Sequence, residues 1–272
     1  MKRYRRDYRD MEKIDSSCIY DKYIEAVGRR YNYSNCYFQK DELKEWLRDK
    51  LAACYDSGDS FVLTVQKKGF VKLYFLADTF DWTSELPEIK KHAGDFDLAV
   101  EIVKHGNLED YDLRKFFPCR KLIQYDRLRS KGIETNVQEE EVFYCEKSDF
   151  MKLRTMMDET FHPIGDYIPS DQELDAFLSG RNVICVRDGE KIEGFIIYED
   201  KGKTSYIRMV CVNRSARGKG QGERLMRMYF AVHQGYKGFT LWCRADNVPA
   251  MRLYAKIGQY RNEDLHNFVF VW

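Results

Sequence analysis

A glycine-rich segment in the C-terminal half has the residues needed to bind phosphate. It stands between a predicted strand and a predicted amphipathic helix and reads Arg217-Gly218-Lys219-Gly220-Gln221-Gly222. Glycines let the backbone approach a ligand without Cβ atoms in the way. Backbone N–H groups converge at the start of a helix, where the helix dipole favours an anion. Since Arg217 and Lys219 add positive charge, the segment predicts a diphosphate-binding loop.

Two other phosphate-binding loops fit this spacing less well. A Walker A loop needs Gly-Lys followed by Ser or Thr, whereas Lys219 is followed by Gly220. A Rossmann loop has the spacing G-x-G-x-x-G, whereas the glycines here follow G-x-G-x-G. The remaining alternative is a flexible loop without a ligand. A strand-to-helix position with two cations favours anion binding over that alternative.

The residues around this loop resemble motif A of the GNAT superfamily of N-acetyltransferases. The segment 210–222 contains the motif's core, R/Q-x-x-G-x-G/A, with Arg217, Gly220 and Gly222 in the defining positions. It departs from the family pattern at Arg214, where the family often has Pro; this alters the turn before the loop but not its donors.

A second segment, 247–258, resembles motif B of the same family. Asn247, Ala250, Tyr254 and Gly258 stand in the expected places. The two motifs occur in the family's order at about the family's distance. The resemblance extends over residues 138–272, although the motifs themselves occupy only 210–258.

This resemblance implies that acetyl-CoA is the cosubstrate. In the family, two central strands diverge and the pantetheine arm lies between them, bound by the backbone of the first strand, by the loop and by the Asn of motif B. The cofactor-binding residues implied are Val210, Cys211, Val212, Arg217, Gly218, Lys219, Gly220, Gln221, Gly222 and Asn247.

The implied reaction is transfer of the acetyl group to a primary amine of a small molecule or peptide. The resemblance gives Val210 N–H as the oxyanion donor and Tyr254 as the acid that protonates the leaving thiolate. Packing in the helix core is the alternative role for Tyr254. The general base is not identified, and many family members use water. The titratable candidates, each also interpretable as a solvated surface residue, are Glu159, Glu193, Glu199, Asp200 and His162, with His233 expected on a helix surface.

The hydrophobic pattern of the C-terminal half predicts a mixed α+β fold. We expect a GNAT-like, mostly antiparallel sheet with flanking helices over residues 138–272. Ser170 and Glu173 form a predicted capping box. The expected strands are 141–145, 182–187, 192–198, 205–212, 239–243 and 268–272, and the expected helices are 149–161, 170–178, 225–232 and 249–257.

The N-terminal half, residues 1–135, is expected to be a second α+β domain. Its order of helix 41–53, hairpin 61–65 and 70–76, strand 96–103, helix 108–117 and strand 122–128 parallels the other half. We interpret it as a degenerate GNAT-like companion that helps to shape the acceptor site, with an unrelated α+β domain as the alternative. Its glycines are isolated, so we expect no cofactor loop there. Residues 129–140 are the predicted linker.

Composition gives no sign of a nucleic-acid or membrane partner. The 272 residues include 45 Lys and Arg against 44 Asp and Glu. No apolar stretch is long enough to span a bilayer, and the N-terminus lacks the apolar core of a signal peptide, so we expect a cytoplasmic protein. The eight cysteines are expected to be reduced and buried, without a metal site. Two rival functions remain: a non-catalytic acyl-CoA sensor, and RNA binding through the basic segment 2–6.

Overall fold

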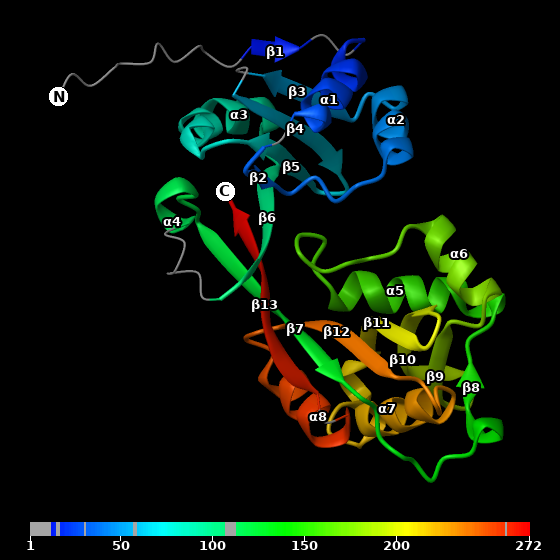
Figure 1. Ribbon diagram of the computed structural model, residues 1–272. Helices are drawn as coiled ribbons and strands as arrows, with labels where there is room; N and C mark the ends of the chain where they lie inside the picture. Colours follow the sequence, from blue (N-terminus) through cyan, green and yellow to red (C-terminus); the bar gives the residue numbers. More distant parts are fainter. Residues whose placement is uncertain (1–11, 15–16, 30, 57–58, 107–112, 259) are drawn as a thin grey trace. The chain divides into compact units, whose positions relative to one another are not determined.

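The computed structural model describes residues 12–14, 17–29, 31–56, 59–106, 113–258 and 260–272. The basic segment 2–6 and residues 108–112 of the expected helix 108–117 lie outside these residues. The chain divides into two compact units (Figure 1). Unit 1 comprises Met1–Ile123 with Phe268–Trp272, and unit 2 comprises Gln124–Asn267. Residues 124–130, from the N-terminal half of the sequence, therefore belong to unit 2. Residues 268–272, at the C-terminal end, belong to unit 1.

Unit 1 is an α+β unit. In its sheet, strands follow the order β1-β3-β4-β5-β6, and β2 pairs with β5. The hairpin of β4 and β5 is antiparallel, whereas β5 and β6 are parallel. The strands are β1 (Glu12–Ile14), β2 (Tyr33–Ser34), β3 (Ala52–Asp56), β4 (Ser60–Lys67), β5 (Phe70–Ala77) and β6 (Asp97–His105), and the helices are α1 (Ile19–Gly28), α2 (Lys40–Arg48), α3 (Leu86–Ala93) and α4 (Leu113–Phe116).

The expected helix 41–53 is partly wrong. Helix α2 ends at Arg48, and Lys50 takes the left-handed backbone conformation with φ 57°. Ala52 and Ala53 then belong to strand β3, where they pair with Val65 and Thr64 of β4. A left-handed residue commonly ends a helix, but that residue is usually Gly, so the sequence carries no visible stop here.

Unit 2 has the expected mixed fold. Its sheet follows the order β7-β12-β11-β10-β9-β8, in which only β11 and β12 are parallel. Its strands are β7 (Lys121–Ser130), β8 (Phe143–Tyr144), β9 (Val183–Asp188), β10 (Lys191–Lys201), β11 (Thr204–Val212), β12 (Gly238–Arg244) and β13 (Arg261–Val271), and its helices are α5 (Phe150–Thr160), α6 (Asp171–Ser179), α7 (Gln221–Ala231) and α8 (Val248–Gly258).

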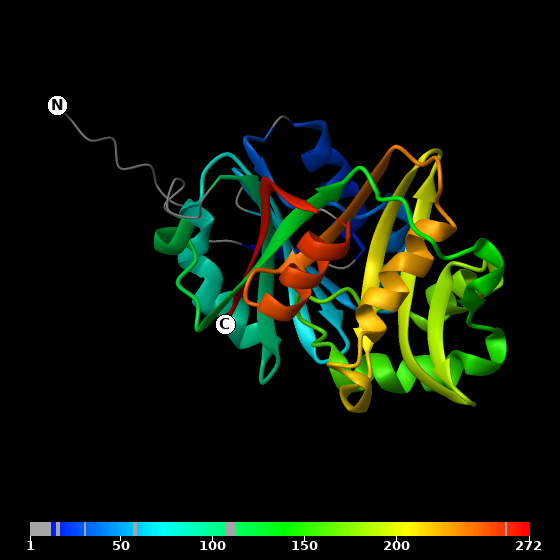
Figure 2. The same ribbon diagram turned by 90° about the horizontal axis from the view of Figure 1, so that it is seen from below.

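Helices cover both faces of this sheet (Figures 1 and 2). Helices α7 and α8 pack on one face, where Leu225, Tyr229 and Tyr254 belong to one buried cluster. Helices α5 and α6 pack on the other, where Leu153 and Leu174 join residues of β9, β10 and β11. The capping box at α6 is confirmed: Ser170 Oγ accepts from Glu173 N–H at 3.2 Å, and Glu173 Oε2 accepts from Ser170 N–H at 2.7 Å.

Candidate active site

The two parallel strands of unit 2 separate halfway along their length. Strands β11 and β12 pair only from Thr204 with Gly238 to Ile207 with Leu241. Beyond this last pair, β11 continues to Val212 and β12 continues to Arg244. A register shift against β10 makes Arg208 the extra residue of a bulge, which bends the strand where the two separate. The edge of β11 from Arg208 to Val212 therefore has no strand partner on the β12 side.

The hydrogen-bond pattern with β10 decides which backbone groups face this opening. Asn213 N–H donates to Glu193 O at 2.8 Å. Because hydrogen-bonded pairs alternate along an antiparallel ladder, Cys211 also directs its backbone groups toward β10. Val210 and Val212 direct theirs away from β10, into the opening. The Cys211 thiol lies in the core under α5 and α6, 3.6 Å from Thr160 Oγ1.

The glycine-rich loop joins β11 to α7. Gly218 and Gly220 have φ values of 76° and 80°, and no atom lies within 4 Å of the Cβ position of either. Gly222 has a different role, because a Cβ there would lie 3.0 Å from Leu253 of α8. Among the described residues, no acceptor is found for the backbone N–H groups of residues 218–222. The start of α7 thus presents several unpaired donors to an anion.

Positive charge surrounds the loop. Arg217 is exposed and its Nε donates to Val212 O at 3.1 Å. Within the described part of the chain, no acidic partner is found for the exposed Arg214, Arg217 and Lys219. The Gln221 side chain turns instead to the buried Glu193, whose carboxylate accepts from Gln221 Nε2. The loop therefore offers cations and backbone donors, while the Gln221 amide is already engaged.

The two motif B residues have different surroundings. Asn247 is exposed and caps α8, since its Oδ1 accepts from Ala250 N–H at 3.3 Å. Tyr254 is 7% exposed and packs in the core under α7 and α8. Burial raises the pKa of Tyr254, and the nearby Cys243 raises it further. Cys243 lies on β12 beyond the last pair with β11, so Tyr254 lies beside the diverging part of β12.

Several base candidates are already bound to other groups. Glu199 accepts from Arg208 Nε at 2.9 Å, and Glu193 is buried against Gln221 rather than solvated. Glu159 and His162 are exposed. No described residue stands out as a dedicated base.

His233 is not on a helix surface, and that expectation is wrong. The side chain is buried, with 3% of the residue exposed, and follows the end of α7. Its Nδ1 lies 2.6 Å from Tyr229 O and its Nε2 lies 3.1 Å from Asp200 Oδ1. Both ring nitrogens face acceptors, so this group ties α7 to the β10–β11 hairpin.

A row of rings and guanidinium groups beside the opening was not predicted from the sequence. Arg127, Tyr206, Arg208 and Trp242 lie next to one another across β7, β11 and β12, and Arg208 also contacts Tyr167. The available signal was the pattern of β12, where Trp242 stands between the core residues Leu241 and Cys243. Alternation places Trp242 on the opposite face of the sheet.

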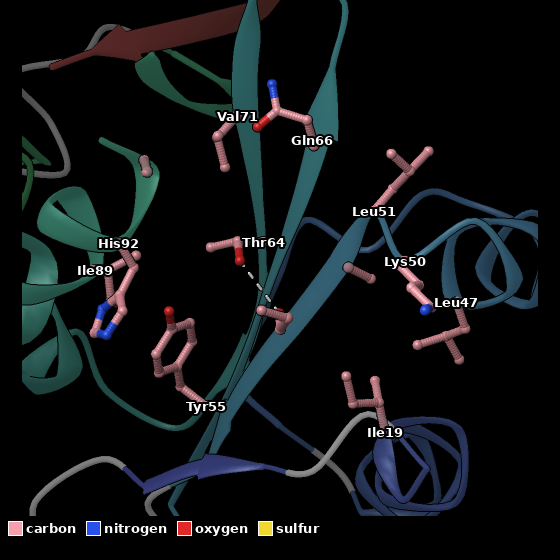
Figure 3. A pocket seen from close by; sticks show the side chains of 13 residues that line it. Ile19, Leu47, Lys50, Leu51, Tyr55, Thr64, Gln66, Val71, Ile89 and His92 are labelled. Carbon is pink, nitrogen blue, oxygen red and sulfur yellow. Dashed lines mark hydrogen bonds between the residues drawn. The ribbon is translucent and has the colours of Figure 1, made fainter. Parts of the chain in front are cut away.

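Unit 1 has a separate cavity of about 750 Å³. Residues on both sides of strand β3 line this cavity (Figure 3). On one side they are Tyr55, Ile89 and His92, and on the other they are Ile19, Leu47 and Lys50. None of its lining residues is a glycine, and all of them belong to unit 1. It therefore does not coincide with the loop predicted to bind diphosphate.

The parallel strands of unit 1 also pair over only part of their length. Strands β5 and β6 pair from Phe70 with Asp97 to Leu73 with Val100. Beyond that point, the buried Asn35 donates hydrogen bonds to the carbonyls of Leu73 and Glu101. The chain itself bridges the two strands there.

All eight cysteines are free thiols, and five of them are buried. In the part of the chain that the structure describes, no group of His, Cys, Asp or Glu is arranged to hold a metal ion. No helix among those residues is both long and apolar enough to cross a membrane.

Comparisons with known proteins agree with this geometry. A model of the "Acetyltransferase (GNAT) family" matches residues 150–259. No curated protein matches the chain. The structure is similar to a GCN5-related N-acetyltransferase from Sphaerobacter thermophilus, with TM-score 0.59 and 13% identity over 98% of this chain and 96% of that one.

Two further similar structures also extend over both halves. An acetyltransferase of the GNAT family from Colwellia psychrerythraea has TM-score 0.52 and 12% identity, over 97% of this chain and 100% of that one. A tandem GNAT protein from the clavulanic acid biosynthesis pathway has TM-score 0.54 and 9% identity, over 97% and 98%. The fold of GNAT proteins thus extends along the whole chain, and residues 150–259 form a domain of the GNAT acetyltransferase family.

Proposed function

We propose that unit 2 is an acetyl-CoA-dependent N-acetyltransferase that acetylates a primary amine of a small molecule or peptide. The observation that carries this proposal is the position of the loop. Unpaired N–H groups at the start of α7 and three exposed cations lie at the end of β11, just past the stretch where β11 has separated from β12. A diphosphate bound there leaves the attached pantetheine arm free to follow the unpaired edge of β11.

In this proposal, the loop residues 217–222 bind the diphosphate of acetyl-CoA. Gly218 and Gly220 have open space at their Cβ positions, so the phosphates can approach the backbone closely. The backbone groups of Val210 and Val212 bind the amides of the arm, as an adjoining strand would. Asn247, at the start of α8, contacts the arm from the β12 side.

The reaction then needs one bond formed and one broken. The neutral amine attacks the thioester carbonyl, which forms the C–N bond, and the Val210 N–H stabilises the oxyanion. The C–S bond breaks, Tyr254 protonates the leaving thiolate, and the extra amine proton passes to water. The raised pKa of Tyr254 keeps its hydroxyl protonated at neutral pH, as an acid requires. This proton donor distinguishes the enzyme from a non-catalytic acyl-CoA sensor.

Unit 1 is, by the same proposal, a degenerate GNAT-like companion that binds no acyl-CoA. Its strand-to-helix segment between β5 and α3 has no glycine and carries Asp78, Asp81 and Glu85. Negative side chains there oppose phosphate binding.

The test combines two measurements on the full chain. Calorimetry with acetyl-CoA should give saturable binding, and thiol release with a panel of primary amines should give turnover above the rate without amine. Binding without turnover of any amine would favour the sensor. Absence of binding would overturn the proposal.

A further inference from the structure

We propose that the amine acceptor carries a carboxylate, and that Arg127 binds this carboxylate on the face of the sheet opposite α7 and α8. The proposal rests on the proposed acetyl transfer and names the chemical class of its acceptor. It is carried by a buried donor without an acceptor, set in a row of aromatic rings at the point where β11 and β12 separate.

The row alternates rings and guanidinium groups across unit 2. The Arg208 guanidinium lies 4.3 Å from the Tyr167 ring and 5.0 Å from the Tyr206 ring. The Arg127 guanidinium lies 5.4 Å from the Tyr206 ring and 5.4 Å from the Trp242 ring. A guanidinium group within about 6 Å of a ring centroid is attracted to the face of that ring. A chain of cation–π contacts therefore connects the members of the row.

Its position relative to the strands places it beside the proposed thioester. Arg208 and Trp242 are each the first residue beyond the last β11–β12 pair, Ile207 with Leu241. Trp242 pairs directly with Arg127 of β7. The buried cluster under α5 and α6 includes residues of β9, β10 and β11. The row lies next to this cluster and extends over β12 and β7. An amine that reaches the opening from this face passes over the row.

The two arginines differ in what they already bind. Arg208 Nε donates to Glu199 Oε1 at 2.9 Å. Arg127 Nη2 donates to Thr240 Oγ1 at 3.1 Å, whereas the buried Arg127 Nε has no hydrogen-bond acceptor among the described residues. The Arg127 side chain as a whole is 28% exposed, so a ligand can reach its guanidinium group. A buried donor left unpaired costs free energy, and a carboxylate would satisfy it with a charge-assisted bond.

The positive charge of Arg127 is only partly balanced by neighbouring carboxylates. Glu263 Oε2 is 3.8 Å from Arg127 Nε, beyond hydrogen-bond distance. Glu263 also accepts from Arg129 Nη1 at 3.3 Å. One carboxylate thus faces two guanidinium groups. A carboxylate on the acceptor would balance the second, while the Trp242 and Tyr206 rings would contact its apolar part.

The test compares amines that differ only in the carboxylate. Thiol release would be measured with L-phenylalanine against phenethylamine, and with γ-aminobutyrate against propylamine. In at least one pair, the acid should have the higher kcat/KM by on the order of tenfold or more, since a site built around a polar contact rejects the analogue that lacks it. Arg127→Gln should remove most of this preference through KM, without changing the Kd of acetyl-CoA.

A matched control and a binding measurement complete the design. Arg181→Gln changes an exposed arginine that contacts the Tyr144 ring but belongs neither to the row nor to the pair with Glu263, and should keep the preference. Calorimetry on the free protein tests the carboxylate contact without acetyl-CoA. It compares N-acetyl-L-phenylalanine with N-acetylphenethylamine, and N-acetyl-γ-aminobutyrate with N-acetylpropylamine, and in the preferred pair only the acid should bind.

Equal kcat/KM within both pairs, an equal effect of Arg127→Gln on both members of the preferred pair, or failure of both acetylated acids to bind would each overturn this inference. Failure of acetyl-CoA itself to bind would overturn the proposed function, which the calorimetry with N-acetyl-L-phenylalanine does not depend on.

Discussion

The side-chain oxygen of Asn35 accepts a hydrogen bond from the backbone N–H of Phe75 at 2.6 Å, and the backbone N–H of Asn35 donates to Phe75 O at 3.2 Å. Asn35 Nδ2 also donates to Leu73 O at 3.1 Å and to Glu101 O at 3.0 Å. The Asn35 side chain thus hydrogen-bonds to backbone groups of both β5 and β6, beyond the point where these two strands pair. In unit 2, the equivalent edge of β11 remains unpaired.

Replacing Asn35 should therefore destabilise the protein. Asn35→Leu leaves the Phe75 N–H and two carbonyls without their partners in a site where Asn35 is only 2% exposed. Unpaired buried groups cost about 1–3 kcal/mol each, so the loss of partners for three groups should lower the free energy of unfolding by at least about 3 kcal/mol. Urea denaturation followed by circular dichroism measures it.

Asn32→Leu is the matched control for that variant. Asn32 is exposed, and its side chain donates to Asp78 O at 3.2 Å. The control should change stability by less than about 1 kcal/mol, the net value of a typical hydrogen bond. Similar losses in both variants would contradict the role given to Asn35.

The same contacts predict the stoichiometry of acetyl-CoA. Because Asn35 occupies the backbone groups of β5 that an acyl-CoA arm would need, unit 1 should not bind the ligand. Titration calorimetry on the full chain should give one acetyl-CoA per chain. Two equivalent sites per chain would contradict both the companion role of unit 1 and the comparison of the two strand edges.

Local sequence patterns predicted most of unit 2. The hairpin of β9 and β10, the strand β11, the helix after the loop and the capping box at Ser170 depend on neighbouring residues, so their signals are contiguous. The position of the glycine-rich segment between a strand and a helix also follows from local spacing. Periodicity and capping are short-range, and they survive in a single sequence.

The features that the sequence did not reveal depend on distant partners. Strand β13 begins at Arg261, seven residues before the expected start at Phe268, because its polar first half shows no apolar alternation. The pairing of β7 with β12, and of Arg127 with Trp242, joins residues more than 100 positions apart. Such pairings are set by the whole sheet, so no local pattern predicts them.

Gly220 provides a charge test of the loop. Gly220 has φ 80°, a conformation that Asn and Asp tolerate better than other side chains, and its Cβ position is open. Gly220→Asp places a carboxylate beside the proposed diphosphate, whereas Gly220→Asn adds a side chain of the same size without charge. We expect calorimetry to give a Kd for acetyl-CoA raised at least about tenfold more by Asp than by Asn. Equal values would remove the loop from the diphosphate site.

Tyr254→Phe tests the proposed acid. The variant keeps the ring in its contact with Tyr260, at 5.8 Å between centroids, and removes the proton. We expect kcat to fall on the order of 100-fold, as for loss of general acid catalysis, with little change in the Kd of acetyl-CoA. Tyr260→Phe removes a buried hydroxyl that has no partner and should leave kcat unchanged. An unaltered kcat in Tyr254→Phe would limit Tyr254 to packing.

The pH profile supplies a second readout for Tyr254. Burial raises the pKa of this phenol above its usual value of about 10. A raised pKa means that the proton is retained as pH increases, so the acid form persists throughout the neutral and mildly alkaline range. We therefore expect no decline in kcat between about pH 7 and pH 10. A decline in that range which disappears in Tyr254→Phe would show an ordinary or lowered pKa.

A fragment of residues 138–272 should not fold into an active enzyme, although it contains both GNAT motifs. It lacks β7, which pairs with β12 along six residues from Phe239 to Arg244 and contributes the buried Leu128 to the core under α7 and α8. It also carries Phe268 and Phe270, whose rings are buried in unit 1 and would lose their partners. An unpaired β12 edge and two exposed rings favour aggregation. Circular dichroism and gel filtration of the fragment should give poor secondary structure or aggregates, whereas the full chain elutes as a discrete species. A soluble fragment with full activity on an accepted amine would contradict this account and would also remove unit 1 from any share in the acceptor site.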